Sequence, residues 1–346
     1  MTWEDFLSSQ GATVENLKTS GFAPHWQSDA LQAGFVAPLT DLGLIRVTGE
    51  DAPSFLHNQL SNDVEHLGTT ELRRAAYCTP KGRMLASFVY WKDGQDIILQ
   101  LSKSIQATVQ KRLQMFVLRA KAKLHDINAE YVVLGLGGSA APAALQVWFP
   151  ELPAKVDQKL SNEYGGLLRV ADANNAPRYQ WIAPVEIAQQ AWLKLNTQLQ
   201  AVNTSAWRAT EIQAGIAIVI ASTQEKFVPQ MINFELIGGV NFKKGCYPGQ
   251  EIVARSQYLG KLKRRMAIAL VHSNDVTAGT EVFHSDDVSQ PCGMIVNAEQ
   301  HQEGSSLALI EMKLADQESG QLTLGSATGA AIELQALPYA ITDITQ

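Results

Sequence analysis

The sequence predicts an α+β protein that ends in a small β-barrel, and three observations support this fold class. Segments of strand type alternate with segments of helical periodicity over residues 39–260. Short apolar runs then recur at even spacing, with turns between them, over residues 261–346, which is typical of a small barrel. The chain has 346 residues, more than one small core accommodates, so two or three domains are expected.

The composition is that of an ordinary soluble globular protein, with 46% hydrophobic and 18% charged residues. A net charge of −6 argues against a strong, general electrostatic hold on nucleic acid. Cys78, Cys246 and Cys292 lie far apart without a CxxC pair, which indicates a reducing compartment and no permanent metal site. No apolar run approaches the roughly 18 residues of a membrane span, and the N-terminus lacks a signal-peptide pattern. We therefore expect a cytoplasmic protein.

Residues 1–38 are predicted to form an N-terminal extension, with a short helix at residues 3–8 and a loop after it. The next predicted helix has Phe55 and Leu60 on its apolar side, and we interpret His57 on it as a solvated residue rather than a ligand. Ser104 can cap a further helix. Strands are predicted at residues 42–48, 73–79, 84–91, 97–101, 121–126 and 131–136.

The second half of the chain continues the alternation. Residues 135–140 match Gly-x-Gly-x-x-Ala, a dinucleotide-binding fingerprint, but the acid expected about 20 residues later is missing, so nucleotide binding is not expected. Residues 150–165 are predicted to be irregular, and helices are expected at residues 184–199 and from Trp207 onward. Strands are predicted at residues 167–171, 179–183, 267–272, 281–283, 293–296, 306–312 and 331–334.

A basic cluster marks the start of the barrel region. It is either a solvated strand start or a contact for an acidic partner or an RNA phosphate. Its members are Lys261, Lys263, Arg264 and Arg265.

Residues 238–260 contain the densest group of special residues in the chain. Cys246 follows Lys243 and Lys244, and a helix is predicted to open at residues 249–251 with Glu251 in its first turn, where the helix dipole favours an anion. Two cations and a nearby helix start both favour thiolate over thiol. From these residues alone, two interpretations of Cys246 stay open: a reactive thiol, or a small buried hydrophobic residue.

The run Lys244, Gly245, Cys246, Tyr247, then Gly249, Gln250 and Glu251 resembles the signature of the YgfZ family of folate-binding proteins. This family is related to the glycine-cleavage T-protein, an aminomethyltransferase. The resemblance extends from Leu39 to the C-terminus. It implies a T-protein-like fold, in which α+β lobes and a C-terminal barrel form a multi-lobed ring around a central hole. Relatives bind tetrahydrofolate in that hole.

The resemblance also assigns residues to folate. The Lys81-Gly-Arg83 turn is either a simple turn or a pair of cations held to meet a carboxylate, and a similar turn in the family favours the second interpretation. Lys81, Arg83, Lys243 and Lys244 are thus candidates for the glutamate tail.

Three further positions concern the pterin. Trp207 is either a folate-contacting tryptophan or a core tryptophan. Gln213 replaces the glutamate usual in relatives, so it accepts a hydrogen bond but carries no charge. Leu42 stands where some relatives have a second tryptophan, and therefore that stacking contact is absent.

One departure bears on activity. The T-protein has Gly-Gly-x-x-Asp-Asp across this turn and strand, with one essential aspartate, whereas this chain has no carboxylate at Leu85, Ala86 or Ser87. Losing a positioned acid or base commonly costs about 10²–10⁴-fold in rate. Aminomethyl transfer is therefore not expected.

The resemblance implies a folate-binding accessory protein that supports iron–sulfur cluster enzymes, including those that methylthiolate tRNA, with Cys246 as a working thiol. One alternative is an active folate-dependent one-carbon (aminomethyl or methyl) transferase that uses Glu235 or Glu251. Another is a scaffold whose folate site has decayed.

Overall fold

The structure, a computed structural model, describes residues 1–23, 28–258, 262–318 and 320–342. The chain forms two compact units. The first unit comprises Met1–Ala52, His66–Arg73 and Val89–Thr210, and the second comprises Pro53–Glu65, Arg74–Phe88 and Glu211–Gln346. Within the described residues, no helix is both long and apolar enough to cross a membrane.

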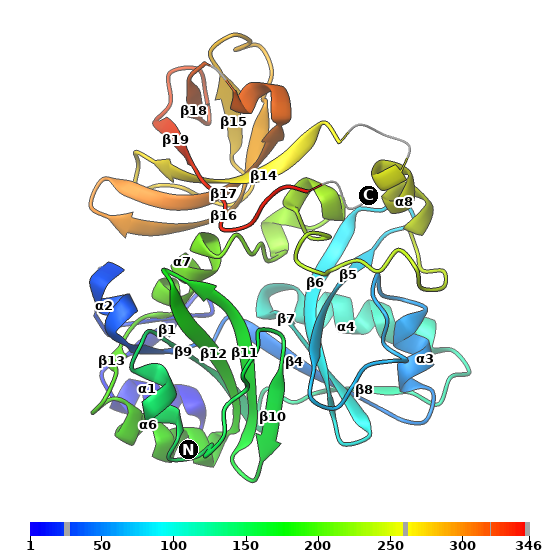
Figure 1. The fold of residues 1–346 in the computed structure, drawn as a ribbon, viewed down its shortest axis with the longest axis vertical. Coiled ribbons are helices and arrows are strands. Elements are labelled where there is room, and N and C mark those ends of the chain that lie inside the picture. The colour runs from blue at the N-terminus through cyan, green and yellow to red at the C-terminus, as the bar shows by residue number, and fades with distance from the viewer. Residues whose placement is uncertain (24–27, 259–261, 319, 343–346) are drawn as a thin grey trace. The chain divides into compact units, whose positions relative to one another are not determined.

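A six-stranded sheet organises the first unit (Figure 1). Its neighbouring strands are antiparallel except for the short parallel pair β3 and β13. The core beside this sheet contains Trp3, Trp181 and Trp192 together with many aliphatic side chains. In sheet order the strands are β10 (Lys159–Asn162), β11 (Gly165–Ala173), β12 (Ala176–Pro184), β9 (Tyr131–Gly137), β3 (Phe35–Pro38) and β13 (Gln200–Ala201). The helices α5 (Ala141–Leu145) and α6 (Val185–Leu195) contribute to this core.

The N-terminal segment contains more structure than predicted. The helix α1 (Trp3–Ser9) is confirmed, and Thr2 and Asp5 close its first turn as a capping box. The loop expected after it is wrong, because β1 (Thr13–Glu15), β2 (Lys18–Ser20), α2 (Ser28–Ala33) and β3 occupy that stretch. These elements of three to six residues are too short to show periodicity. The domain boundaries at residues 38/39 and 260/261 stay predictions.

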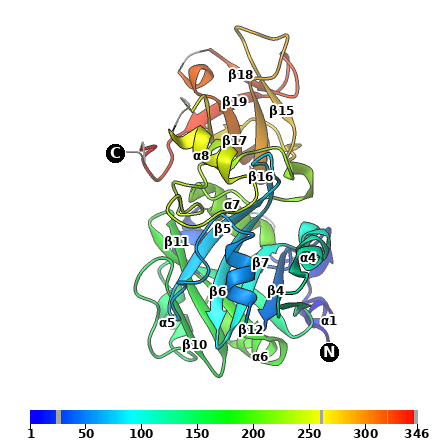
Figure 2. The ribbon, with the colours of Figure 1, turned by 90° about the vertical axis from the view of Figure 1, so that its right-hand side faces the viewer.

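Five further strands form a second sheet. In sheet order they are β5 (Leu72–Cys78), β6 (Met84–Asp93), β7 (Asp96–Ser102), β4 (Leu42–Thr48) and β8 (Lys123–Asp126). All five were predicted within about two residues. The helix α4 (Lys103–Val117) packs on β4, β7 and β8, and Figure 2 shows it beside β4 and β7. The expected cap at Ser104 is wrong, because the helix begins at Lys103 and its N-cap is Ser102.

The predicted barrel is confirmed in the second unit as a closed ring of six strands (Figure 1). Closure leaves no free sheet edge, and apolar side chains fill the interior. In ring order the strands are β14 (Arg264–Val271), β17 (Ser305–Lys313), β16 (Gly293–Gln302), β15 (Glu281–His284), β18 (Leu322–Leu324) and β19 (Ala331–Gln335). Of the six barrel strands, only the three-residue β18 was not predicted. The remaining elements are α3 (Ala52–His57), α7 (Thr204–Gln213), α8 (Gln250–Tyr258) and the 3-10 turns η1 (Ala221–Thr223), η2 (Pro229–Ile232) and η3 (Leu314–Gln317).

Candidate functional site

The Cys246 thiol lies at the surface of the second unit, in an irregular loop just before α8. The loop is anchored by Tyr247, which is buried, and burial raises the pKa of its phenol. Cys78 and Cys292 are buried instead, and burial raises the pKa of Cys78 to about 12. The interpretation as a small buried hydrophobic residue therefore suits these two cysteines and fails for Cys246.

Lys244 ties the cysteine loop to the end of α3. Its ammonium donates hydrogen bonds to the carbonyl oxygens of His57 and Leu60, the latter at 3.0 Å, and lies 4.9 Å from the centre of the Tyr247 ring. Burial lowers the pKa of Lys244 to about 8, although Asp63, Cys246 and Glu65 oppose the shift by their charges. A cation at the C-terminal end of a helix meets carbonyls that lack helical partners.

His57 contradicts its interpretation as a solvated residue, since it is only 8% exposed. Its Nδ1 lies 3.1 Å from the Asp63 carboxylate and 3.9 Å from Glu65. Its Nε2 faces the cysteine loop, because a β-carbon built on Gly245 would stand 3.7 Å from this atom. No spacing in the sequence indicates this contact, which joins residues far apart in the chain.

The Lys81-Gly-Arg83 turn lies against the same loop. Gly82 and Gly249 both have positive φ, and their backbones are in direct contact. The fold thus brings together two motifs that the sequence analysis treated separately. Lys81 is exposed, whereas Arg83 is half-buried and donates hydrogen bonds to the Lys226 carbonyl and, at 3.8 Å, to the Met231 sulfur.

The stretch without an aspartate lies in β6. Leu85, Ala86 and Ser87 are all buried there, and the Ser87 hydroxyl accepts the Val219 N–H at 3.0 Å. A hydroxyl engaged in this way holds the backbone of the second unit together and supplies no acid.

The two glutamates of the transferase alternative differ in environment. Glu235 is buried in an ion pair with Arg265. Glu251 is exposed in the first turn of α8, as predicted, and lies 3.6 Å from Arg255. The Glu235 carboxylate cannot reach a substrate unless its ion pair with Arg265 breaks.

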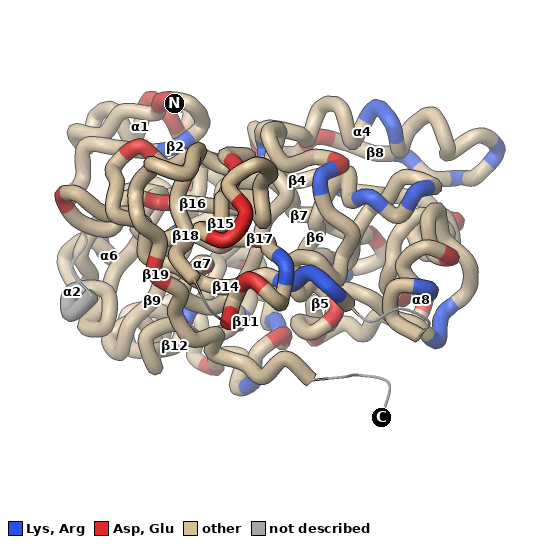
Figure 3. The backbone as a smooth tube through the Cα atoms, turned by 90° about the horizontal axis from the view of Figure 1, so that it is seen from above, with Lys and Arg blue, Asp and Glu red and all other residues tan. Residues whose placement is uncertain are grey.

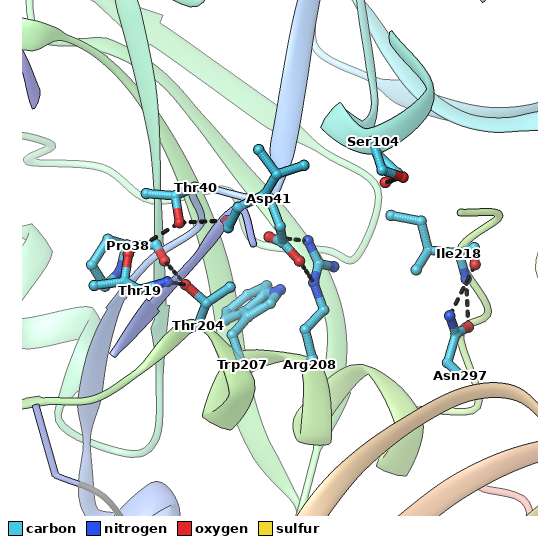
Figure 4. A network of polar contacts seen from close by, with 12 residues as sticks. Thr19, Pro38, Thr40, Asp41, Ser104, Thr204, Trp207, Arg208, Ile218 and Asn297 are labelled. Atoms are coloured by element: carbon cyan, nitrogen blue, oxygen red, sulfur yellow. Dashed lines mark hydrogen bonds and ion pairs between the residues drawn. The ribbon is translucent and has the colours of Figure 1, made fainter. Parts of the chain in front are cut away.

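Trp207 is fully buried in the first unit. Its indole packs on Gly135, and the Arg178 guanidinium lies 4.9 Å from the ring centre. The neighbouring Arg208 binds both carboxylate oxygens of Asp41, at 2.7 and 2.8 Å, as Figure 4 shows. These contacts fix the start of α7 in the first unit and leave the Trp207 side chain without exposed surface.

Leu42 lines a cavity of about 500 Å³ in the first unit. Leu39, Leu44 and Val133 add apolar wall, and Lys103 adds a cation. Apolar walls with a few polar groups, at this volume, are typical of small-molecule sites. Gln213 is half-buried at the last residue of α7. The residues assigned to folate therefore fall in both units, with Leu42 and Trp207 in the first and the others in the second.

The basic residues assigned to the folate tail are not equivalent. Lys244 and Arg83 bind backbone carbonyls of their own unit, while Lys81 and Lys243 are exposed and make no side-chain hydrogen bond or ion pair with any described residue. Only the latter two have all their donors available for a ligand.

Elsewhere, in the first unit, Lys and Arg follow one another along α4 and β8 (Figure 3). Among the described residues, no group of His, Cys, Asp and Glu is arranged to hold a metal ion.

Two residues of the basic cluster before the barrel, Arg264 and Arg265, form ion pairs within the second unit. Lys261 lies outside the described residues. Arg264 pairs with Glu311 and Arg265 with Glu235, so the interpretation as a solvated strand start is wrong for the buried Arg265.

Comparison with solved structures defines the class of fold. The glycine cleavage system aminomethyltransferase T from Bartonella henselae matches with a TM-score of 0.74 and 16% identity, over 90% of this chain and 88% of that one. This protein therefore has the aminomethyltransferase T fold, α+β with a C-terminal six-stranded barrel, as the sequence predicted.

Curated relatives identify the family. The tRNA-modifying protein YgfZ of Cronobacter sakazakii is 29% identical over 309 residues, which covers 88% of this chain and 93% of the relative. The protein of the same name from Escherichia coli (strain K12 / DH10B) is 30% identical over 228 residues, covering 66% of this chain and 69% of the relative. The chain belongs to the YgfZ family. No protein-family model matches it.

Proposed function

We propose that this protein is a cytoplasmic, folate-binding accessory protein that supports iron–sulfur enzymes of tRNA modification, including methylthiolation, with Cys246 as its working thiol. The observation that carries the proposal is the exposed Cys246, in a loop that Lys244 ties to the end of α3 and that contacts the Lys81-Gly-Arg83 turn through Gly249. The related proteins are named as tRNA-modifying, which gives the direction of the function.

The missing acid separates this function from that of the aminomethyltransferase. Leu85, Ala86 and Ser87 supply no carboxylate, and the buried Glu235 is engaged by Arg265. Without a positioned acid or base, the transfer step loses about 10²–10⁴-fold in rate. The transferase alternative requires turnover of a methyl- or aminomethyl-bearing amine with tetrahydrofolate as acceptor.

Folate fits the residues present in part. In the first unit, the cavity lined by Leu42 offers apolar wall of the kind that a pterin packs against. In the second unit, the exposed Lys81 and Lys243 have ammonium donors available for carboxylates. Gln213 and Trp207 complete the proposed set, Trp207 from a buried position. When bound, tetrahydrofolate supplies a carrier for one-carbon units.

The first experiment tests the thiol. A deletion strain is complemented with wild type, Cys246→Ser or Cys292→Ser, and methylthiolated nucleosides in its tRNA are measured by mass spectrometry. We expect wild type and Cys292→Ser to restore them and Cys246→Ser to fail. Full restoration by Cys246→Ser would end the thiol proposal.

The second experiment tests folate. Tetrahydrofolate is titrated against wild type, Trp207→Phe, a Lys81→Gln/Lys243→Gln double variant and a Lys111→Gln control, and tryptophan fluorescence and calorimetry record binding. We expect saturable binding by wild type and the control, and weaker binding by the double variant. No binding by wild type would leave a scaffold with a decayed folate site.

A further inference from the structure

His57 and Asp63 form a dyad beside the cysteine loop. A carboxylate only accepts hydrogen bonds, so the 3.1 Å contact with Asp63 places the imidazole proton on Nδ1. Nε2 is then an acceptor. It faces Gly245, the residue before Cys246, and no described residue forms a hydrogen bond with it. The His57 side chain is only 10% exposed, so the imidazole is held in place by packing as well as by Asp63.

We propose that His57, oriented by Asp63, is the general base that activates the Cys246 thiol, and that the activated thiol acts on electrophilic sulfur. This inference rests on the proposed function, because it assigns a mechanism and a substrate class to the same thiol. An oriented imidazole that can take the proton of a nearby cysteine makes its sulfur nucleophilic near neutral pH. Here Nε2 faces Gly245, the residue that precedes Cys246.

With a persulfide as the sulfur donor, the step balances in atoms and electrons. The thiol proton passes to His57 Nε2, and the Cys246 sulfur attacks the outer sulfur of a persulfide. A new S–S bond forms on Cys246 as the S–S bond of the donor breaks, and the donor leaves as a thiolate that can take the proton from Nε2. The product is a Cys246 persulfide and a donor thiol. No external oxidant or reductant is needed, and thiol exchange at sulfur proceeds in this way.

The charges around the dyad are compatible with this role. Asp63 lies 3.1 Å and Glu65 lies 3.9 Å from the imidazole Nδ1, and the Lys244 ammonium interacts with the charges of Asp63, Glu65 and Cys246. Tyr247 also packs at this site, with the centre of its ring 4.9 Å from the Lys244 ammonium. An ammonium has three N–H donors and no acceptor, so Lys244 cannot replace His57 as the proton acceptor.

The test is the pH dependence of Cys246 alkylation. Purified wild type, His57→Gln, Asp63→Asn and Glu65→Gln react with iodoacetamide between pH 5 and 9, and intact mass reports the rate. Cys78 and Cys292 are buried, and Cys246→Ser gives the background. At pH 7 an unassisted cysteine is only a few per cent thiolate. We therefore expect His57→Gln to react roughly tenfold more slowly than wild type, with its rate rising at higher pH. Asp63→Asn should also react more slowly than wild type, with its rate rising at higher pH. Glu65→Gln should change the alkylation rate by less than about twofold.

A second readout uses glutathione persulfide as the sulfur donor. We expect a mass gain of one sulfur on wild type, little on His57→Gln and none on Cys246→Ser. Thermal melting identifies a misfolded variant, and Asp63→Asn, which keeps the side-chain volume, decides the case if His57→Gln does not fold. Identical alkylation profiles in wild type and the folded dyad variants would overturn the inference.

The outcome is separable from that of the proposed function. If the dyad variants alkylate like wild type but Cys246→Ser still abolishes tRNA methylthiolation, only the role of His57 is wrong. If Cys246→Ser supports methylthiolation, the proposed function fails whatever the alkylation rates are.

Discussion

The backbone of Gly249 is in direct contact with the backbone of Gly82. A β-carbon at Gly249 would stand 2.8 Å from the Gly82 Cα and 2.4 Å from the Thr79 carbonyl oxygen. Both glycines also have positive φ, +84° and +71°, which other residues adopt at a cost. The cysteine loop and the Lys81-Gly-Arg83 turn therefore meet only because neither residue has a side chain at this point.

This contact predicts a large effect of Gly249→Ala. The left-handed backbone alone costs about 1–2 kcal/mol, and overlap with the turn adds about 1–3 kcal/mol. Gly238→Ala is the matched control, because Gly238 has φ +76° but open space around its Cα. Urea unfolding should show Gly249→Ala to be the less stable variant by at least about 1 kcal/mol. Equal losses in the two variants would mean that the close approach does not matter.

Lys244 predicts a pH-dependent stability. Its pKa is about 8 in the folded chain, below the ordinary lysine value of 10.5, so the unfolded chain binds more protons between these two values. The contribution of Lys244 to the free energy of unfolding therefore rises as the pH rises from about 8 toward 10.5. The difference in free energy of unfolding between wild type and Lys244→Met should grow over this range.

Urea unfolding at several pH values measures this difference. Comparison with a variant cancels the opposite contribution of Cys78, whose raised pKa weakens the fold at high pH. The exposed neighbour Lys243 provides the control, and the Lys243→Met difference should stay flat. A flat Lys244→Met difference would show that its ammonium is not desolvated.

Local patterns were enough to predict much of this fold. β4 has the predicted bounds, Leu42–Thr48, because its apolar run ends at a glycine that strands disfavour. Helix α8 begins where Gly249 and Gln250 indicated, and Glu251 occupies its first turn. Each of these two signals comes from residues next to one another in the chain, so it can be recognised in a single sequence.

The surroundings of Cys246 could not be predicted in the same way. His57 reaches Gly245 only through tertiary packing, and the Lys244 ammonium, which resemblance assigned to folate, binds two carbonyls at the end of α3. Hydropathy patterns carry no information on contacts between residues so far apart in the chain, and a histidine on a short helix gives no sign of which face is covered.

The glycines of the apparent dinucleotide fingerprint have a packing role. A β-carbon at Gly135 would lie 2.4 Å from the Trp207 ring, and one at Gly137 would lie 2.5 Å from Phe35. β9 is antiparallel to both its neighbours, so no βαβ unit exists there. The pattern that imitates a nucleotide site makes room for two aromatic side chains.

Gly135→Ala should therefore destabilise the first unit by about 1–3 kcal/mol, because Trp207 is fully buried and cannot move aside. Gly166→Ala is the matched control, since its β-carbon would meet only the Ser161 hydroxyl at 3.8 Å. Tryptophan fluorescence during urea unfolding follows both variants. Similar free energies of unfolding for Gly135→Ala and Gly166→Ala would show that the Trp207 ring can move aside.

The Glu235–Arg265 pair predicts a loss of stability that also discriminates between functions. Both side chains are buried, so Glu235→Gln leaves the Arg265 charge without its partner, at a cost of about 3–5 kcal/mol. The double variant Glu235→Leu/Arg265→Met removes both charges and should recover most of this loss. A double-mutant cycle by urea unfolding gives the coupling. If Glu235 were instead the acid of a folate-dependent transferase, Glu235→Gln would abolish turnover and leave stability nearly unchanged. A stable, inactive Glu235→Gln protein would therefore support the transferase, whereas an unstable variant places Glu235 in the framework that holds the barrel strand β14.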